Sequence, residues 1–223
     1  MKRATYVCVI ATVIPLVVAL VAGVPAPSLK ATPLLVAQSQ LLALQAVSTL
    51  PTSQLQAIKA DIVAATDQAM QTLEADPTNS DKAFAVADIY NLPASPDFWV
   101  WRSSVTKSEF VNSVGPDGTT FNWTGAGFIT RSAGEQAAWR EIFNGTNEVN
   151  PSLPNVRQAF ADIFSGGTNP APANRTHLLA VARRKATRAE KLLASGTGST
   201  ASPATMTFEG GLSFNDILQA MLQ

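Results

Sequence analysis

Few residues in this chain of 223 amino acids could perform catalysis. His177 is its one histidine and Cys8 its one cysteine, so a nucleophile–histidine system has a single candidate base. No nucleophile motif lies near His177, and its place beside Leu178 predicts a histidine at the surface or boundary of a helix. Cys8 lies in an apolar run, where a thiolate is disfavoured. These counts exclude a disulfide framework, a zinc finger and a multi-histidine metal centre.

The other chemical motifs are weak. Gly196–Thr200 superficially resembles a phosphate loop, but it lacks the lysine of a P-loop and follows a predicted helix instead of opening one. Acids such as Asp61 and Asp67, or Glu74 and Asp76, occur where solvated helix faces and ends normally carry them. Nothing marks two of them as converging on a substrate, as a glycosidase requires. The sequence therefore predicts no catalytic, cofactor-binding or metal-ligating residue.

A basic cluster is the first feature that points to binding. The chain has 16 Lys+Arg and 16 Asp+Glu, a balance that removes the bulk attraction on which general nucleic-acid binding depends. Residues 51–100 nevertheless hold seven acids and two bases, whereas the cluster has one acid, Glu190, and these six bases: Arg175, Arg183, Arg184, Lys185, Arg188 and Lys191. Three roles remain open: a solvated helix face with cations near a helix C-terminus, contact with an acidic neighbouring subunit, or nucleic-acid contact. No aromatic residue is interleaved for base stacking, which disfavours the last role.

An aromatic cluster, Phe98–Trp101, is the second such feature and holds two of the four tryptophans. Aromatic residues at this density form either a core or an interface anchor, and Arg102 lies next to them. The two clusters together supply the candidate partner-contact residues: Trp99, Trp101, Arg102, Arg183, Arg184, Lys185 and Arg188.

Helical patterns dominate the elements that must position these residues. Apolar periodicity and capping signals predict helices over 53–76, 80–92, 132–145, 154–166, 175–195 and from 213 onward, with a further helix start at Thr106. Asn174 is the expected cap of the longest one, 175–195. Strand signals are limited to 204–208 and to a hairpin of 119–123 with 128–130. We therefore expect a mainly α fold: a multi-helix globular domain with at most a short β-hairpin, preceded by an apolar N-terminal helical arm.

Residues 1–50 form an apolar N-terminal segment, separate from the helical domain of residues 51–223. Between Ala4 and Ile58 the only charged residue is Lys30, and a further helix is expected from Leu34 to Leu50. Residues 6–24 are long enough to cross a bilayer and also fit a secretory signal, so membrane contact is possible there. Two other interpretations stay open: a start site placed too far upstream, or an apolar arm buried in an assembly.

Three ordered blocks of sequence resemble a known family. They are Asn79–Ala87 with Ala94–Val105, Val149–Phe160 with Ile163–Gly166, and Ala186–Leu192 with Gly196–Ser199 and Pro203–Gly210. Together they resemble a family of small proteins from the structural-gene region of tailed bacteriophages, usually without an assigned role. The resemblance covers roughly residues 55–222, and the first fifty residues depart from the family pattern.

This resemblance implies a non-enzymatic virion structural or assembly protein of the neck or tail, located in the phage particle. Its partners are then identical copies or other phage structural proteins, with no specific nucleic-acid binding. The resemblance implies no catalytic residues in this chain. The alternative hypothesis is a membrane-anchored or exported helical protein that acts at the host envelope, in the host inner membrane or beyond it.

Overall fold

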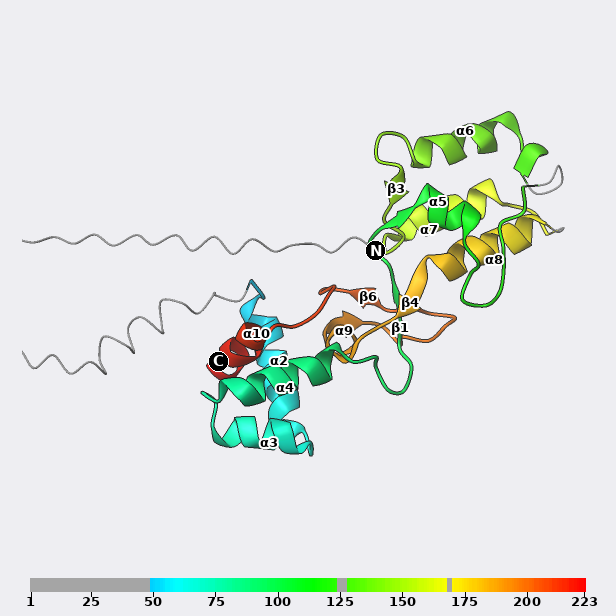
Figure 1. The fold of residues 1–223 in the computed structure, drawn as a ribbon. Coiled ribbons are helices and arrows are strands. Elements are labelled where there is room, and N and C mark those ends of the chain that lie inside the picture. The colour runs from blue at the N-terminus through cyan, green and yellow to red at the C-terminus, as the bar shows by residue number, and fades with distance from the viewer. Residues whose placement is uncertain (1–48, 124–127, 168–169) are drawn as a thin grey trace, which may run out of the picture. The chain divides into compact units, whose positions relative to one another are not determined.

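A computed structural model describes residues 49–123, 128–167 and 170–223, which belong to one compact unit, Ala46–Gln223 (Figure 1). About half of the described residues are helical, and the strands are short. The mainly α class is therefore confirmed. The predicted helix 34–50 and the apolar run 6–24 lie outside the described residues, except for the last two positions of that helix.

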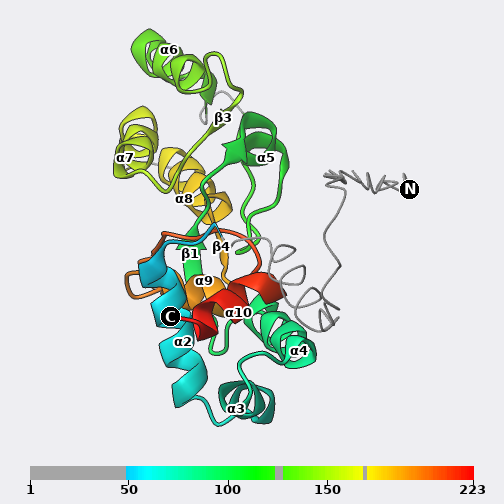
Figure 2. The same cartoon turned by 90° about the vertical axis from the view of Figure 1, so that its left-hand side faces the viewer.

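The first core is formed by helices from both ends of the described chain. It contains α2 (Thr52–Ala64), α3 (Gln68–Ala75), α4 (Ser80–Asn91), α9 (Arg188–Leu193) and α10 (Phe214–Met221). Helix α10 packs against both α2 and α4, as Figure 2 shows. The largest side chains of this core are Ile58, Ile62, Met70, Leu73, Tyr90 and Ile217, all without solvent exposure. The terminal helix that Ser213 and Asp216 predict is confirmed, with both hydrogen bonds of a capping box.

The single helix expected over 53–76 is wrong, because the structure has two helices there. Ala65 has extended backbone angles, and Asp67 caps α3 by accepting hydrogen bonds from the backbone N–H groups of Ala69 (2.8 Å) and Met70 (3.4 Å). An aspartate at an N-cap satisfies N–H groups that have no partner within the helix. The break lets Ile62 and Met70 enter the same core from different helices.

The second core is rich in aromatic side chains. It contains α5 (Lys107–Asn112), α6 (Ala133–Ile142), α7 (Pro154–Ile163) and α8 (Ala171–Val181). The predicted helix starts at Thr106 and Ser132 are confirmed, each as a complete capping box with a glutamate three residues on. The largest side chains with almost no solvent exposure in this core are Phe110, Trp139, Phe160, Phe164 and Leu178.

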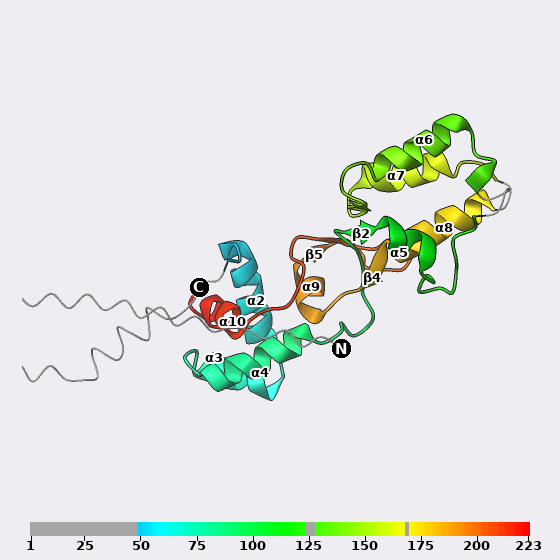
Figure 3. The same ribbon diagram turned by 45° about the horizontal axis from the view of Figure 1, so that its top comes forward.

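The long helix expected over 175–195 is wrong, and this correction relocates the basic cluster. Helix α8 ends at Val181, and the next residues form β4 (Arg183–Lys185), which pairs antiparallel with β1 (Trp99–Trp101). Thr187 then caps α9 in a capping box with Glu190. The chain passes from the first core to the second through β1 and returns through β4, which are both labelled in Figure 1. Figure 3 shows β4 between the helices of the two cores, and we call this pair of strands the β1–β4 ribbon.

Two more antiparallel pairs complete the strands of the described residues. β2 (Val105–Thr106) pairs with β3 (Glu148–Val149), and β5 (Ala194–Ser195) pairs with β6 (Thr205–Met206). The prediction of at most one hairpin therefore underestimated the strand content. The hairpin of 119–123 with 128–130 is also wrong, because Thr120 makes only an isolated bridge, with Val114. None of the described helices is long and apolar enough to span a membrane.

Candidate partner-contact site

A pocket of about 450 Å³ beside the β1–β4 ribbon gathers most of the predicted contact residues. Its wall includes Trp99, Arg102, Arg183, Arg184 and Lys185, five of the seven candidates. Residues from α5, from the loop that follows it and from the end of α8 complete the wall. Trp101 and Arg188 are not among the lining residues.

The ribbon fixes these side chains because β1 has backbone partners along its length. Trp99 lies opposite Lys185, Val100 opposite Arg184, and Trp101 opposite Arg183. The N–H of Trp99 also donates to the carbonyl of Gly198 (2.7 Å). Paired backbone groups and a buried Val100 hold the aromatic and basic side chains in fixed positions at this wall.

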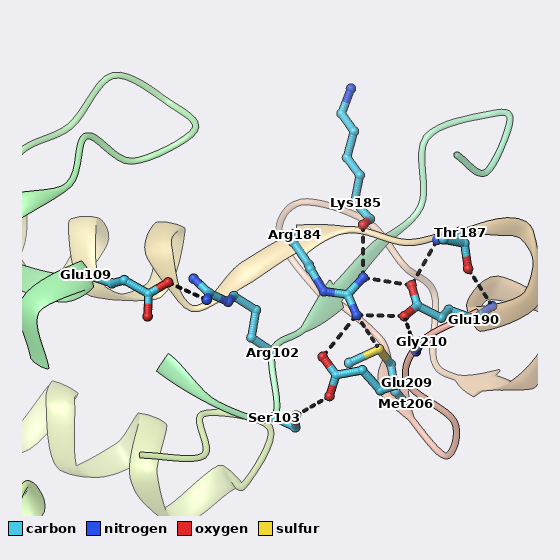
Figure 4. Close-up of polar contacts among 10 residues, drawn as sticks. All are labelled: Arg102, Ser103, Glu109, Arg184, Lys185, Thr187, Glu190, Met206, Glu209 and Gly210. Atoms are coloured by element: carbon cyan, nitrogen blue, oxygen red, sulfur yellow. Dashed lines mark hydrogen bonds and ion pairs between the residues drawn. The ribbon is translucent and has the colours of Figure 1, made fainter. Parts of the chain in front are cut away.

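Arg184 is the central cation of the site (Figure 4). Its Nη1 and Nη2 donate to the two carboxylate oxygens of Glu190, each at 2.7 Å, and Nη2 also donates to Glu209 at 3.0 Å. The Glu190 side chain is only 2% exposed and also accepts from the N–H groups of Thr187 and Gly210. This network ties β4, α9 and the segment after β6 together.

The pKa values in this network shift toward the charged forms. Burial alone would raise the pKa of Glu190, but the hydrogen bonds from Arg184, Thr187 and Gly210 outweigh it and lower that pKa below its usual value. The Glu190 hydrogen bond in turn raises the pKa of Arg184. Both groups therefore stay ionised at neutral pH.

The other basic side chains of the pocket also have carboxylate partners. Arg102 pairs with Glu109 at 2.5 Å, Lys185 with Asp97 at 2.7 Å, and Arg183 with Asp117 at 3.8 Å; these are all the ion pairs that the three cations form with described residues. Each of these cations therefore already has a carboxylate partner within the chain. The cluster is nearly balanced in charge, and its three arginines, each with a side chain less than a third exposed, are better ordered by their pairs than the exposed Lys185 is.

The two tryptophans of β1 have different surroundings. Trp99 is half-buried at the pocket, with the Arg183 guanidinium carbon 5.4 Å and the Lys185 Nζ 6.0 Å from its ring centroid. Trp101 packs against the second core, and the guanidinium carbon of Arg157 lies 4.5 Å from the centroid of its ring. Trp99 is thus the aromatic residue available to a partner, whereas Trp101 contributes to packing.

His177 is buried, which corrects the prediction of a surface or boundary histidine. Its Nε2 lies 2.7 Å from the carbonyl oxygen of Phe110, which only accepts, so Nε2 carries the proton of that bond. Its Nδ1 lies 3.1 Å from the hydroxyl of Thr119, which is 2.7 Å from Asp117. The contact between the Thr119 hydroxyl and His177 could not be predicted from the sequence, because the two residues lie 58 positions apart. With both ring nitrogens engaged and no exposed surface, His177 links α8 to α5 and to the 117–119 turn.

Two further sequence predictions concern helix caps and the glycine-rich loop. Asn174 does not cap a helix; it lies within α8 and hydrogen-bonds both backbone groups of Asn122, at 2.8 and 3.1 Å. Gly198, in the loop that superficially resembled a phosphate loop, has a φ of 65° and directly faces the Phe98 ring. A Cβ at Gly198 would lie 2.1 Å from that ring, so the glycine is explained by packing against Phe98, the residue before β1.

The carboxylates that complete the site were missed by the sequence analysis. Glu109 and Glu190 each stand three residues after a threonine, a capping-box spacing that predicts a helix start but not a contact with Arg102 or Arg184. Glu209 had no signal at all, since its contact with Arg184 spans 25 residues. Among the described residues, no three His, Cys, Asp or Glu side chains form a group able to hold a metal ion.

Comparisons with known proteins give this chain no relative. No protein-family model, no curated protein and no solved structure matches it.

Proposed function

We propose that this chain is a non-enzymatic structural subunit of a tailed bacteriophage particle, in the neck or tail, that acts through contacts with identical copies or other structural proteins. The observation that carries the proposal is the pocket in which the partly buried Trp99 lies among four cations, each paired with a carboxylate. Tryptophan and arginine dominate the binding energy of protein interfaces, and side chains held in place before binding lose little entropy. The phage assignment is supported by the sequence resemblance.

Such a site fits the assembly of subunits better than the attraction of a partner by net charge. Its cations and carboxylates nearly cancel, so a partner gains from contact with Trp99 and from shape fit more than from net charge. Contacts of this kind depend on burying apolar area, at about 25 cal/mol per Å² before ordering costs. Neighbouring subunits in a particle would cover surface that one copy leaves exposed.

The test uses purified particles of a phage whose genome encodes the chain. We expect mass spectrometry to detect its peptides in particles, and deletion of the gene to be rescued by the wild-type chain but not by Trp99→Ala. An exposed control, Trp123→Ala, should rescue normally, since Trp123 is 44% exposed and lies outside the pocket. Absence of the chain from particles, with full infectivity after deletion, would overturn the proposal.

The apolar residues 6–24 favour a second candidate, a membrane-anchored or exported protein. These residues lie outside the described part of the chain. Recovery in an integral-membrane fraction that resists high salt would support this candidate. Peptides from before Gly23 in purified particles would instead support an arm retained in the virion.

A further inference from the structure

A second pocket, away from Trp99, combines an apolar wall with two cations. It has a volume of about 460 Å³, within the usual range for small-molecule sites. Ile89, Leu92, Pro93 and Leu192 supply apolar surface, and Arg188 and Lys191 supply positive charge. Leu92 is 58% exposed, a high value for a leucine beside a pocket.

Asp61, the one acid at this pocket, is already engaged. Its Oδ2 accepts hydrogen bonds from the Tyr90 hydroxyl at 2.7 Å and from Arg188 Nη2 at 2.9 Å. Burial and the hydrogen bond to Asp61 raise the pKa of Tyr90, so its hydroxyl remains a donor. The Arg188 guanidinium also lies 5.1 Å over the Tyr90 ring. Asp61 and Tyr90 therefore hold Arg188 in position.

Unused hydrogen-bond donors remain after these contacts. Within the described chain, Nε and Nη1 of Arg188 have no hydrogen-bond partner, since its contacts involve Nη2. Lys191 has no carboxylate within ion-pair distance among the described residues; its Nζ makes a long contact, 3.4 Å, with the carbonyl of Ser95. Arg188 and Lys191 are three residues apart on α9, so their side chains share one helix face.

We propose that this pocket binds a carboxylate carried on a compact apolar body. Arg188 donates to the carboxylate, Lys191 pairs with its charge, and the apolar body lies against Ile89, Leu92 and Leu192. The formal charge of Arg188, Lys191 and Asp61 sums to +1, which matches a monoanion better than a phosphate dianion. A free carboxylic acid and the C-terminal carboxylate of a neighbouring chain share this chemistry. The inference does not rest on the proposed function, because binding is measured on the isolated chain.

Calorimetric titration of the full chain tests the site with two matched ligand pairs. The first pair is 3-phenylpropionate and its neutral amide; the second is a pentapeptide ending in leucine with a free or an amidated C-terminus. In each pair the carboxylate should bind about tenfold more tightly than the amide, as expected for a charged hydrogen-bonding group. Saturation by the free acid alone identifies a small-molecule site, whereas saturation by the peptide alone identifies a chain terminus.

Two variants of the pocket and one control variant distinguish binding at this site from a general effect of charge. Lys191→Met should weaken carboxylate binding about tenfold and leave amide binding unchanged, because it removes the charge and keeps the stem. Arg188→Lys keeps the charge beside Asp61 but loses the guanidinium donors, and should also weaken binding. Lys59→Met, at a partly buried lysine on α2 outside the pocket, is the matched control and should change nothing. Thermal melting by circular dichroism verifies that each variant is folded.

Several results would overturn the site. These are equal affinities for acid and amide, an unchanged Kd in Lys191→Met, tighter binding of inorganic phosphate than of either carboxylate, or no binding of any carboxylate. None of them bears on the presence of the chain in particles, so this site and the proposed function can fail separately.

Discussion

Arg184 and Glu190 face each other through two parallel hydrogen bonds of 2.7 Å, although they belong to different elements, β4 and α9. The same Glu190 carboxylate completes the capping box that starts α9, by accepting from the N–H of Thr187. One acid therefore both starts a helix and anchors the β1–β4 ribbon to the first core. Loss of this carboxylate should release both elements together.

Glu190→Gln tests this double role. The amide keeps the shape but removes the charge and one acceptor, so that, among the described residues, Arg184 retains only Glu209 as an ionic partner. We expect a loss of about 3 kcal/mol in the free energy of unfolding, near the lower end for breaking a buried ion pair. Urea denaturation followed by circular dichroism measures it. Glu74→Gln, at an exposed acid without an ion pair to any described residue, should change stability by less than about 0.5 kcal/mol.

The lowered pKa of Glu190 also predicts how stability depends on pH. A carboxyl group whose pKa is lower when folded contributes stability above its ordinary value, here 4.5, and loses that contribution as pH falls through the folded pKa. The stability difference between wild type and Glu190→Gln should therefore be constant from pH 7 to about 5 and shrink below that. Urea midpoints at several pH values measure it. A difference that grows on acidification contradicts the assigned direction.

Three helix starts could be predicted from local capping signals. Thr106, Ser132 and Ser213 each begin a helix with an acid three residues on, and such a signal needs no tertiary information. Thr187 has the same spacing to Glu190, but the apolar residues on both sides extended the helical pattern across it. The capping signal at Thr187 was therefore present, but the apolar periodicity of the flanking residues predicted one continuous helix.

The β1–β4 ribbon and its pocket were not predictable in the same way. Val100 pairs with Arg184, which lies 84 positions further along the chain, and three-residue strands give almost no periodic signal. Five residues that the fold places around one pocket could be selected from the sequence, because aromatic and basic clusters are visible by composition. Their five carboxylate partners come from separate segments of the chain, so the charge balance of the pocket becomes visible only in the fold.

The break between α2 and α3 predicts the effect of removing its cap. Asp67→Ala deletes the acceptor for the N–H groups of Ala69 and Met70 and should cost about 1 kcal/mol. Asp67→Asn retains a capping oxygen and should cost much less. Chemical denaturation of the three proteins measures the order. Equal stability of the wild type and Asp67→Ala would contradict the cap.

Gly198→Ala tests why the glycine-rich loop needs a glycine at this position. The new methyl group would meet the Phe98 ring in addition to the strain of a positive φ, so we expect more than about 2 kcal/mol of destabilisation. Gly145→Ala is the matched control, because Gly145 has a φ of 89° but open space around its Cβ position. Its cost, about 1 kcal/mol, reports backbone strain alone. Thermal melting compares the two, and equal costs would exclude the Phe98 contact as a cause.

Replacing the two tryptophans of β1 by alanine should have different effects, mainly on stability for Trp101 and mainly on incorporation into particles for Trp99. Trp101→Ala removes a ring that packs against the second core and under Arg157, and we expect a loss of about 2–3 kcal/mol, less than for a fully buried tryptophan. Trp99→Ala removes a half-buried ring at the pocket, so the fold should persist with a smaller loss while incorporation into particles falls. Denaturation curves and the protein content of purified particles measure the two effects separately. If both variants fold and incorporate normally, the aromatic cluster is neither a packing element nor an anchor for a partner.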